Sequence, residues 1–193
     1  MKKRTDFIVG MLFAAATVIL IVIFMTNDAF FNWAFARHRN ILSWYIRPLF
    51  IIPMVIFAFK KSYTGIFASI FALFTSMFWF SDHPTSNPKI LEFLAYEMDY
   101  LKGTWTAPKI LISLAVPVFF ILLLTAAWKR NWKLVAGVIV GAAVLKLIWS
   151  VVFGGEAGMA ILKPAIAGVI ICLAGLGYYY KKNISKADST KTE

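Results

Sequence analysis

The sequence predicts an all-α integral membrane protein: a bundle of six membrane-spanning helices with one additional amphipathic helix on its outer side. Of the 193 residues, 61% are hydrophobic, only 15% are charged, and the mean hydropathy is +0.76. Water-soluble domains usually have about a quarter of their residues charged. Because much of any folded chain stays exposed, a soluble fold of this length cannot hide so much apolar surface, and the surrounding solvent must be lipid.

Apolar runs of about 20 residues mark the spans, since that length crosses the hydrocarbon core as a helix. The predicted spans cover residues 7–25, 44–59, 63–80, 108–128, 132–153 and 158–180. The breaks between them are basic or rich in glycine, for example Lys60-Lys61-Ser62, Lys129-Arg130-Asn131 and Gly154-Gly155. The first run is too long for a cleaved signal peptide and has its small residues inside, which favours an uncleaved span.

Lysine and arginine in short loops predict the orientation, because positively charged loops stay in the cytoplasm. With the N-terminus inside, most of the 20 basic residues are cytoplasmic and most acidic residues are outside. We therefore predict a plasma-membrane protein with cytoplasmic N- and C-termini. Residues 1–180 form the bundle domain, and residues 181–193 a disordered polar tail. The net charge of +11 is then a topology signal, and nucleic acid is not an expected partner.

The fourth span is preceded by residues 88–102, which predict the amphipathic helix. Asn87 and Pro88 suit its start and Gly103 its end. The apolar stripe expected from helical spacing consists of Leu91, Leu94, Met98 and Leu101. The polar face expected opposite that stripe consists of Lys89, Glu92, Tyr96 and Asp99. Such a helix lies in the plane of the membrane interface, over or beside the bundle.

Small residues predict which spans pack together, because close helix packing holds membrane bundles together. They recur in the first span around Gly10, in the fifth at Gly137 and Gly141, and in the sixth at Gly168 and Gly175. We expect these three spans to be close neighbours.

Three basic residues, Arg47, Lys146 and Lys163, fall within spans in the outer leaflet. A cation at the bilayer centre costs about 2.5–3.5 kcal/mol on insertion scales, although snorkelling relieves part of this. No acidic residue lies at matching depth, so the cations either pair with acids of the outer loops or receive an anionic ligand. Arginine suits phosphate or carboxylate. The predicted binding residues, with nearby aromatics, are Arg47, Lys146, Lys163, Tyr96, Trp105 and Trp149.

The outer loops also hold residues suited to acid–base chemistry. His83 can act as a general base oriented by Glu92 or Glu97. The catalytic set predicted for an enzyme is Glu92, His83, Glu97 and Asp99. With two histidines and one cysteine, no zinc or haem site is expected, and neither a metal nor a cofactor is predicted.

Three functions are compatible with this sequence. The first is an outward-facing polar pocket that binds and transports a small anionic or zwitterionic solute or a lipid headgroup. The second is a membrane enzyme acting on a lipid or isoprenoid at the outer surface, and the third is a non-catalytic accessory subunit of a membrane complex. The expected partners are membrane lipids, an anionic or lipid ligand from the outer side, and further subunits of the same or another kind.

Overall fold

The computed structural model describes residues 2–82, 85 and 87–189, and all regular secondary structure among them is helical. The α-helices are α1 (Lys2–Thr26), α2 (Asp28–His38), α3 (Leu42–Ile46), α4 (Ile51–Phe59), α5 (Tyr63–Thr75), α6 (Pro88–Lys102), α7 (Ala107–Ser113), α8 (Ala115–Trp128), α9 (Trp132–Gly154) and α10 (Leu162–Ser189). Short 3₁₀ segments are η1 (Arg47–Phe50), η2 (Ser76–Phe78) and η3 (Gly155–Ile161).

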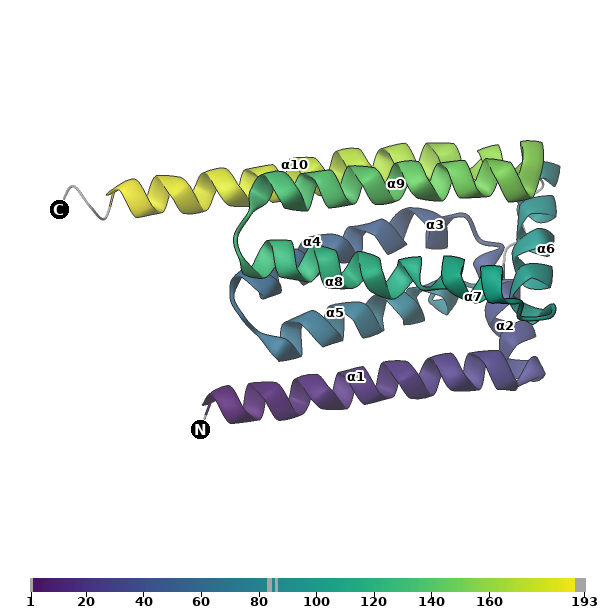
Figure 1. The fold of residues 1–193 in the computed structure, drawn as a ribbon, viewed down its shortest axis with the longest axis horizontal. Coiled ribbons are helices and arrows are strands. Elements are labelled where there is room, and N and C mark those ends of the chain that lie inside the picture. The colour runs from purple at the N-terminus through teal and green to yellow at the C-terminus, as the bar shows by residue number, and fades with distance from the viewer. Residues whose placement is uncertain (1, 83–84, 86, 190–193) are drawn as a thin grey trace.

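The two ends of the bundle differ in construction. Helices α1, α4, α5, α8, α9 and α10 run along the long axis, whereas α2 and α6 lie across one end (Figure 1). We call this the capped end. The opposite end holds both chain termini and the turns between α4 and α5 and between α8 and α9 (Figure 1). We call it the basic end, after its exposed side chains Lys3, Arg4, Lys60, Lys61, Lys129, Arg130, Lys133, Lys181 and Lys182.

Four stretches are long and apolar enough to cross a membrane, which supports the predicted class of all-helical membrane protein. They are Lys3–Thr26, Leu42–Phe59, Ala107–Trp128 and Trp132–Asn183. The last of these contains α9 and α10, which turn back on each other through η3 and lie side by side (Figure 1). A shorter apolar helical stretch covers Tyr63–Phe78. The sequence placed the end of the last span at Tyr180 and a disordered tail beyond it, but α10 continues to Ser189.

Two interruptions in the long helices follow from proline. A proline ring clashes with the carbonyl of the residue four positions earlier and removes a helical hydrogen bond. The residue four positions before Pro53 is Leu49, which lies in the 3₁₀ segment η1, and the residue four positions before Pro117 is Ser113, where α7 ends. The stretch Leu42–Phe59 is therefore a broken helix, with Arg47 at the start of the break.

The predicted close packing of the first, fifth and sixth spans is wrong for the first. Helix α1 packs on α5 and lies on the opposite side of the bundle from α9 and α10 (Figure 1). A Cβ at Gly10 would lie 2.8 Å from the backbone of Tyr63, so glycine permits this contact. The Asp6 carboxylate also accepts hydrogen bonds from Ser62 Oγ and Tyr63 N, both at 2.8 Å, and so caps the start of α5. Helices α9 and α10 do pack together, but Gly137 of α9 faces open space.

Buried apolar side chains form two clusters along the bundle. One lies among α4, α5, α8, α9 and α10 and includes Met54, Val55 and Leu123. The other lies at the capped end, where Phe31 of α2 and Phe93 of α6 are almost completely buried. The capped end therefore has an apolar core of its own, which holds α2 and α6 across the bundle.

Candidate functional site

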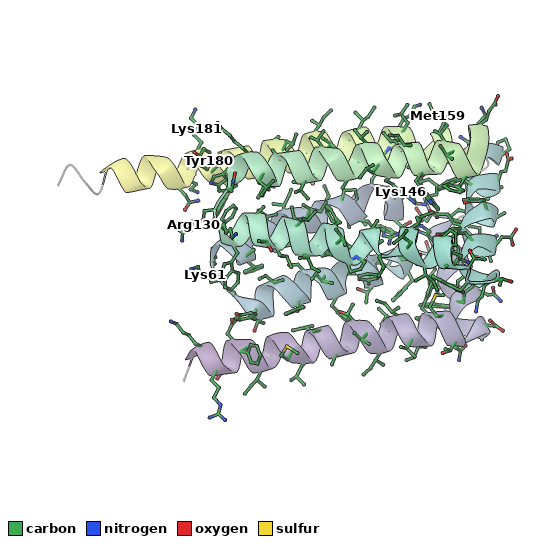
Figure 2. The ribbon with its side chains drawn as sticks, viewed as in Figure 1. Lys61, Arg130, Lys146, Met159, Tyr180 and Lys181 are labelled. Carbon is green, nitrogen blue, oxygen red and sulfur yellow. The ribbon has the colours of Figure 1, made fainter. Side chains whose placement is uncertain are left out.

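Ionisable side chains from four separate elements meet beneath α6 at the capped end. They are His38 at the end of α2, Arg47 in η1, Glu97 in α6 and Lys146 in α9, and we call them the charge cluster. Lys146 Nζ donates a hydrogen bond to Glu97 Oε1 at 3.1 Å. Arg47 lies close enough to interact electrostatically with Glu97, and both cations act on His38. Figure 2 labels Lys146 on α9, towards the capped end.

Glu97 reaches the cluster because the buried face of α6 is shifted slightly from the predicted stripe. Leu94, Met98 and Leu101 lie in or against the apolar core of the capped end as predicted, but Leu91 is 39% exposed, and Ile90 and Phe93 are buried in its place. Residues three and four apart lie on the same helical face, so Glu97 follows Phe93 and Leu94 inward. A second series with the same helical periodicity was present in the sequence, and it includes one acidic residue, Glu97. Its positions are 90, 93, 94, 97 and 101.

An aromatic wall borders the cluster. The Lys146 ammonium lies 4.4 Å from the ring centroid of Trp149 and 5.7 Å from that of Phe93. Tyr96 and Tyr100 pack against Trp149 with ring centroids 5.9 and 5.3 Å away. The Trp149 Nε1 atom is buried and has no hydrogen-bond partner in the described part of the chain. Burial, Tyr100 and the Glu97 carboxylate raise the pKa of the Tyr96 phenol, which therefore stays protonated as a donor.

His38, which the sequence analysis did not assign, belongs to the cluster as a neutral imidazole. Burial lowers its pKa well below 6.5, and the charges of Arg47 and Lys146 act in the same direction. Its Nδ1 lies 2.8 Å from Ser43 Oγ, which donates its own proton to the Asn40 carbonyl at 2.8 Å. This arrangement fits the neutral tautomer that carries its proton on Nδ1 and its lone pair on Nε2.

The charge cluster contains one more cation than it has carboxylates to neutralise. Arg47 and Lys146 are cationic, Glu97 is the one carboxylate among them, and His38 is neutral. Arg47 is a partly exposed residue, and its guanidinium makes no hydrogen bond or ion pair with residues 2–82, 85 or 87–189. Other cations of the capped end do form ion pairs, as in the two hydrogen bonds of 2.9 and 3.0 Å from Arg39 to Asp82.

Several residues predicted for the site do not join the cluster. Lys163 is exposed and has no polar or ring contact with the described residues. Trp105 instead packs on the Lys109 ammonium, 4.6 Å from its ring centroid, and its Nε1 donates to the Leu101 carbonyl. Glu92 and Asp99 are exposed on the outer face of α6.

Of the predicted catalytic set, the structure thus brings only Glu97 together with predicted binding residues, namely Arg47, Lys146, Tyr96 and Trp149. His83 lies outside the described residues. Within those residues, no group of three or more His, Cys, Asp or Glu side chains is arranged to hold a metal ion.

Fold and site together define an all-helical chain with membrane-spanning stretches and a partly unpaired charge cluster at one end. No known protein family, no curated protein and no solved structure matches this chain. The ground for assigning a function is therefore the chemistry of the charge cluster.

Proposed function

We propose that this chain is a multi-pass plasma-membrane protein with six spans and cytoplasmic termini. The pairing of α9 with α10 in one apolar stretch supports two passes there, and the apolar stretch Tyr63–Phe78 supplies a short pass between α4 and the capped end. The basic end carries most of the exposed lysines and arginines, and such residues favour the cytoplasmic side. The capped end then faces outward, with α6 lying in the outer interface.

At the capped end, the protein binds a small anionic or zwitterionic solute or a lipid headgroup. The observation that carries this proposal is the unpaired Arg47 beside the Lys146–Glu97 pair. A half-buried cation without a partner is costly, and an anion that supplies its missing hydrogen bonds is stabilised in return. A planar guanidinium binds carboxylate or phosphate through two parallel hydrogen bonds.

Further donors surround the same place. The Lys146 ammonium has three protons, and one is used on Glu97. The Trp149 N–H is buried without a described acceptor. Glu97 can also accept from the cationic part of a zwitterion. This mixture of donors and one acceptor favours a headgroup-sized ligand with at least one anionic group.

Transport is the use that the helix geometry favours. Arg47 lies where the stretch Leu42–Phe59 breaks into a 3₁₀ segment. Transporters commonly bind their substrates at interrupted membrane helices, where backbone groups are freed and the helix can bend.

An enzyme acting on a lipid or isoprenoid at the outer surface is the second candidate. The specific observation in its favour is His38, a neutral imidazole with a free Nε2 near two cations. The exposure of Glu92 and Asp99 weakens the acid–base set predicted from the sequence. A protein that neither binds an anion nor turns over a lipid would fit the remaining alternative, an accessory subunit.

Binding is tested by titrating the purified full-length protein, in neutral detergent, with inorganic phosphate while measuring its thermal unfolding midpoint. Ligand binding to the folded state raises the midpoint. We expect a rise for the wild type and for Lys163→Ala, and a much smaller rise for Arg47→Ala. Lys163 is the matched control, because it is a cation of the same predicted leaflet outside the cluster.

The variant Arg47→Lys covers the case in which Arg47→Ala does not fold, because it keeps the charge and loses the two-pronged contact. An equal phosphate response in wild type and both Arg47 variants would contradict binding at this cluster. Native mass spectrometry of co-purified species then separates a retained lipid from a soluble anion. Uptake of the retained species into proteoliposomes tests transport, and turnover of a lipid that stops in His38→Gln would establish the enzyme instead.

A further inference from the structure

At the basic end, α9 and α10 leave a shallow groove of about 130 Å³ between them. Its lining is apolar and aromatic and includes Trp132 and Ala136 of α9 and Gly177 and Tyr180 of α10. An apolar cavity of roughly 150 Å³ binds a molecule the size of benzene, so a groove of this volume has room for a short piece of hydrocarbon. The groove is therefore suited to a piece of hydrocarbon chain.

The groove exists because two helices that pack closely elsewhere carry small residues here. A Cβ added at Gly177 would meet no atom within 4 Å, so the space beside it is open. The rings of Trp132 and Tyr180 approach to 4.6 Å between centroids at the end of the groove. Aromatic rings with a polar edge are typical of the level at which lipid headgroups lie.

Two lysines lie one helical turn from groove residues. Lys133 is three positions before Ala136, and Lys181 is four positions after Gly177, and both are exposed. Because residues three and four apart share a helical face, both lysines lie beside the groove on their helices, and their long side chains are able to reach its mouth. Figure 2 labels Tyr180 and Lys181 near the same end of the bundle as Arg130.

The described charge around the groove is mostly positive. None of the nine exposed basic side chains that define the basic end forms an ion pair with a described residue. The acidic side chain described here, Asp6, is engaged by Ser62, Tyr63 and Thr64 at the start of α5. An anion at the mouth of the groove thus meets little competition from the chain itself.

We propose that this groove binds one anionic phospholipid, with the phosphate between Lys133 and Lys181 and part of an acyl chain over Gly177. Basic residues beside an apolar groove between membrane helices recognise anionic lipids through both parts of the molecule. The lysines at the other turn, Lys60 and Lys61, lie outside the groove lining, 6.0 and 5.9 Å from the ring centroids of Phe57 and Trp128. The groove is independent of the ligand proposed for the capped end.

The test is native mass spectrometry of the full-length protein in neutral detergent, titrated with palmitoyl-oleoyl phosphatidylglycerol and, separately, phosphatidylcholine. We expect the first lipid bound to be phosphatidylglycerol with clear preference. Lys133→Gln combined with Lys181→Gln weakens this first binding by about tenfold or more, from roughly one kcal/mol for each basic residue at a membrane surface. Lys60→Gln combined with Lys61→Gln, which removes equal charge from the other turn, leaves it nearly unchanged.

A second pair of variants tests the apolar half of the site. Gly177→Leu fills the groove without changing charge, and we expect several-fold weaker binding of the first lipid. Gly137→Leu also places a side chain in open space, but Gly137 does not line the groove, so binding stays near wild type. If the two lysine pairs weaken binding of the first lipid equally, the lipid is held by diffuse surface charge and not by this site. If Gly177→Leu does not weaken that binding, the acyl chain does not lie in the groove. Either result overturns the proposal.

Discussion

The two ends of this bundle use charge in opposite ways. At the capped end, all four ion pairs formed among the described residues link separate elements, such as α6 to α9 through Glu97 and Lys146. At the basic end the cations are exposed and unpaired, and the described carboxylate, Asp6, caps a helix instead. Charge at the capped end is therefore part of the tertiary structure, whereas charge at the basic end remains available to the surroundings.

The largest effect should come from removing the carboxylate on which the charge cluster depends. Glu97→Gln leaves Arg47 and Lys146 without a counter-charge, and we expect a loss of about 2 kcal/mol in unfolding free energy. The value lies below that of a fully buried pair because the Lys146 side chain is 49% exposed. Thermal or denaturant unfolding in detergent measures it.

The matched control is Glu156→Gln, which removes a carboxylate from an exposed pair at the same end. The side chains of Lys89 and Glu156 are 57% and 92% exposed, so the expected loss is below about 0.5 kcal/mol. In Glu97→Gln, added phosphate should restore more stability than in the wild type. Equal losses in the two variants would mean that the capped end is held no more tightly by charge than an ordinary surface.

Acidification should weaken the capped end next. The pKa of folded His38 lies well below 6.5, the ordinary value that applies to the unfolded chain. As pH falls below about 6.5, the His38 imidazole is protonated in the unfolded chain but stays neutral in the folded chain. The free energy of unfolding therefore declines by up to about 1.4 kcal/mol per pH unit. Above that pH this contribution is constant. Unfolding midpoints of wild type and His38→Gln between pH 5 and pH 8 should diverge at the acidic side; parallel profiles would show that His38 titrates normally.

A smaller effect should follow from the helix cap at the basic end. Asp6→Ala removes the acceptor for Ser62 Oγ and Tyr63 N, and we expect a loss of unfolding free energy smaller than that of Glu97→Gln. Because Asp6 acts through short hydrogen bonds and not through a lysine, added salt should change this loss little. A loss that vanishes in high salt would instead assign Asp6 to an ion pair and make the two ends alike.

The smallest effect is expected for the free cations themselves. Lys133→Gln combined with Lys181→Gln should change the unfolding free energy in lipid-free detergent by less than about 0.5 kcal/mol, because neither side chain has an ionic partner to lose. The same measurement with phosphatidylglycerol present should separate the variant from the wild type. A large loss without lipid would show that these lysines stabilise the bundle directly.

Hydropathy and turn residues could predict the elements, while the way the elements face one another could not be predicted. The helix at 88–102 has the predicted bounds, because Asn87 and Pro88 define its start locally. Its buried face was predicted correctly at Leu94, Met98 and Leu101 but not at Leu91, and the inward position of Glu97 was missed because its partner, Lys146, is distant in sequence. His38 was not predicted for the site because the two cations that act on it come from η1 and α9, although its direct contacts with Ser43 and Trp44 are local.

The glycine patterns show a further limit on prediction from sequence. Small residues permit close helix packing but do not require it. Gly10 is used for contact with α5, where Asp6 adds hydrogen bonds, whereas Gly137 and Gly141 meet nothing within 4 Å. The sequence could therefore identify which helix faces were able to pack closely, and only tertiary contacts selected among them.

The broken helix at Leu42–Phe59 also bears on how the chain enters the membrane during synthesis. It is the least hydrophobic of the four long apolar stretches, and Arg47 lies within it. The next helical stretch, Tyr63–Phe78, is short for a span. We expect that neither segment partitions efficiently alone and that the two enter the bilayer together as a hairpin with Lys60 and Lys61 left behind in the cytoplasm. Glycosylation mapping of residues 42–59 alone and of residues 42–78 in a host protein would reveal this dependence, and efficient insertion of the shorter segment would refute it.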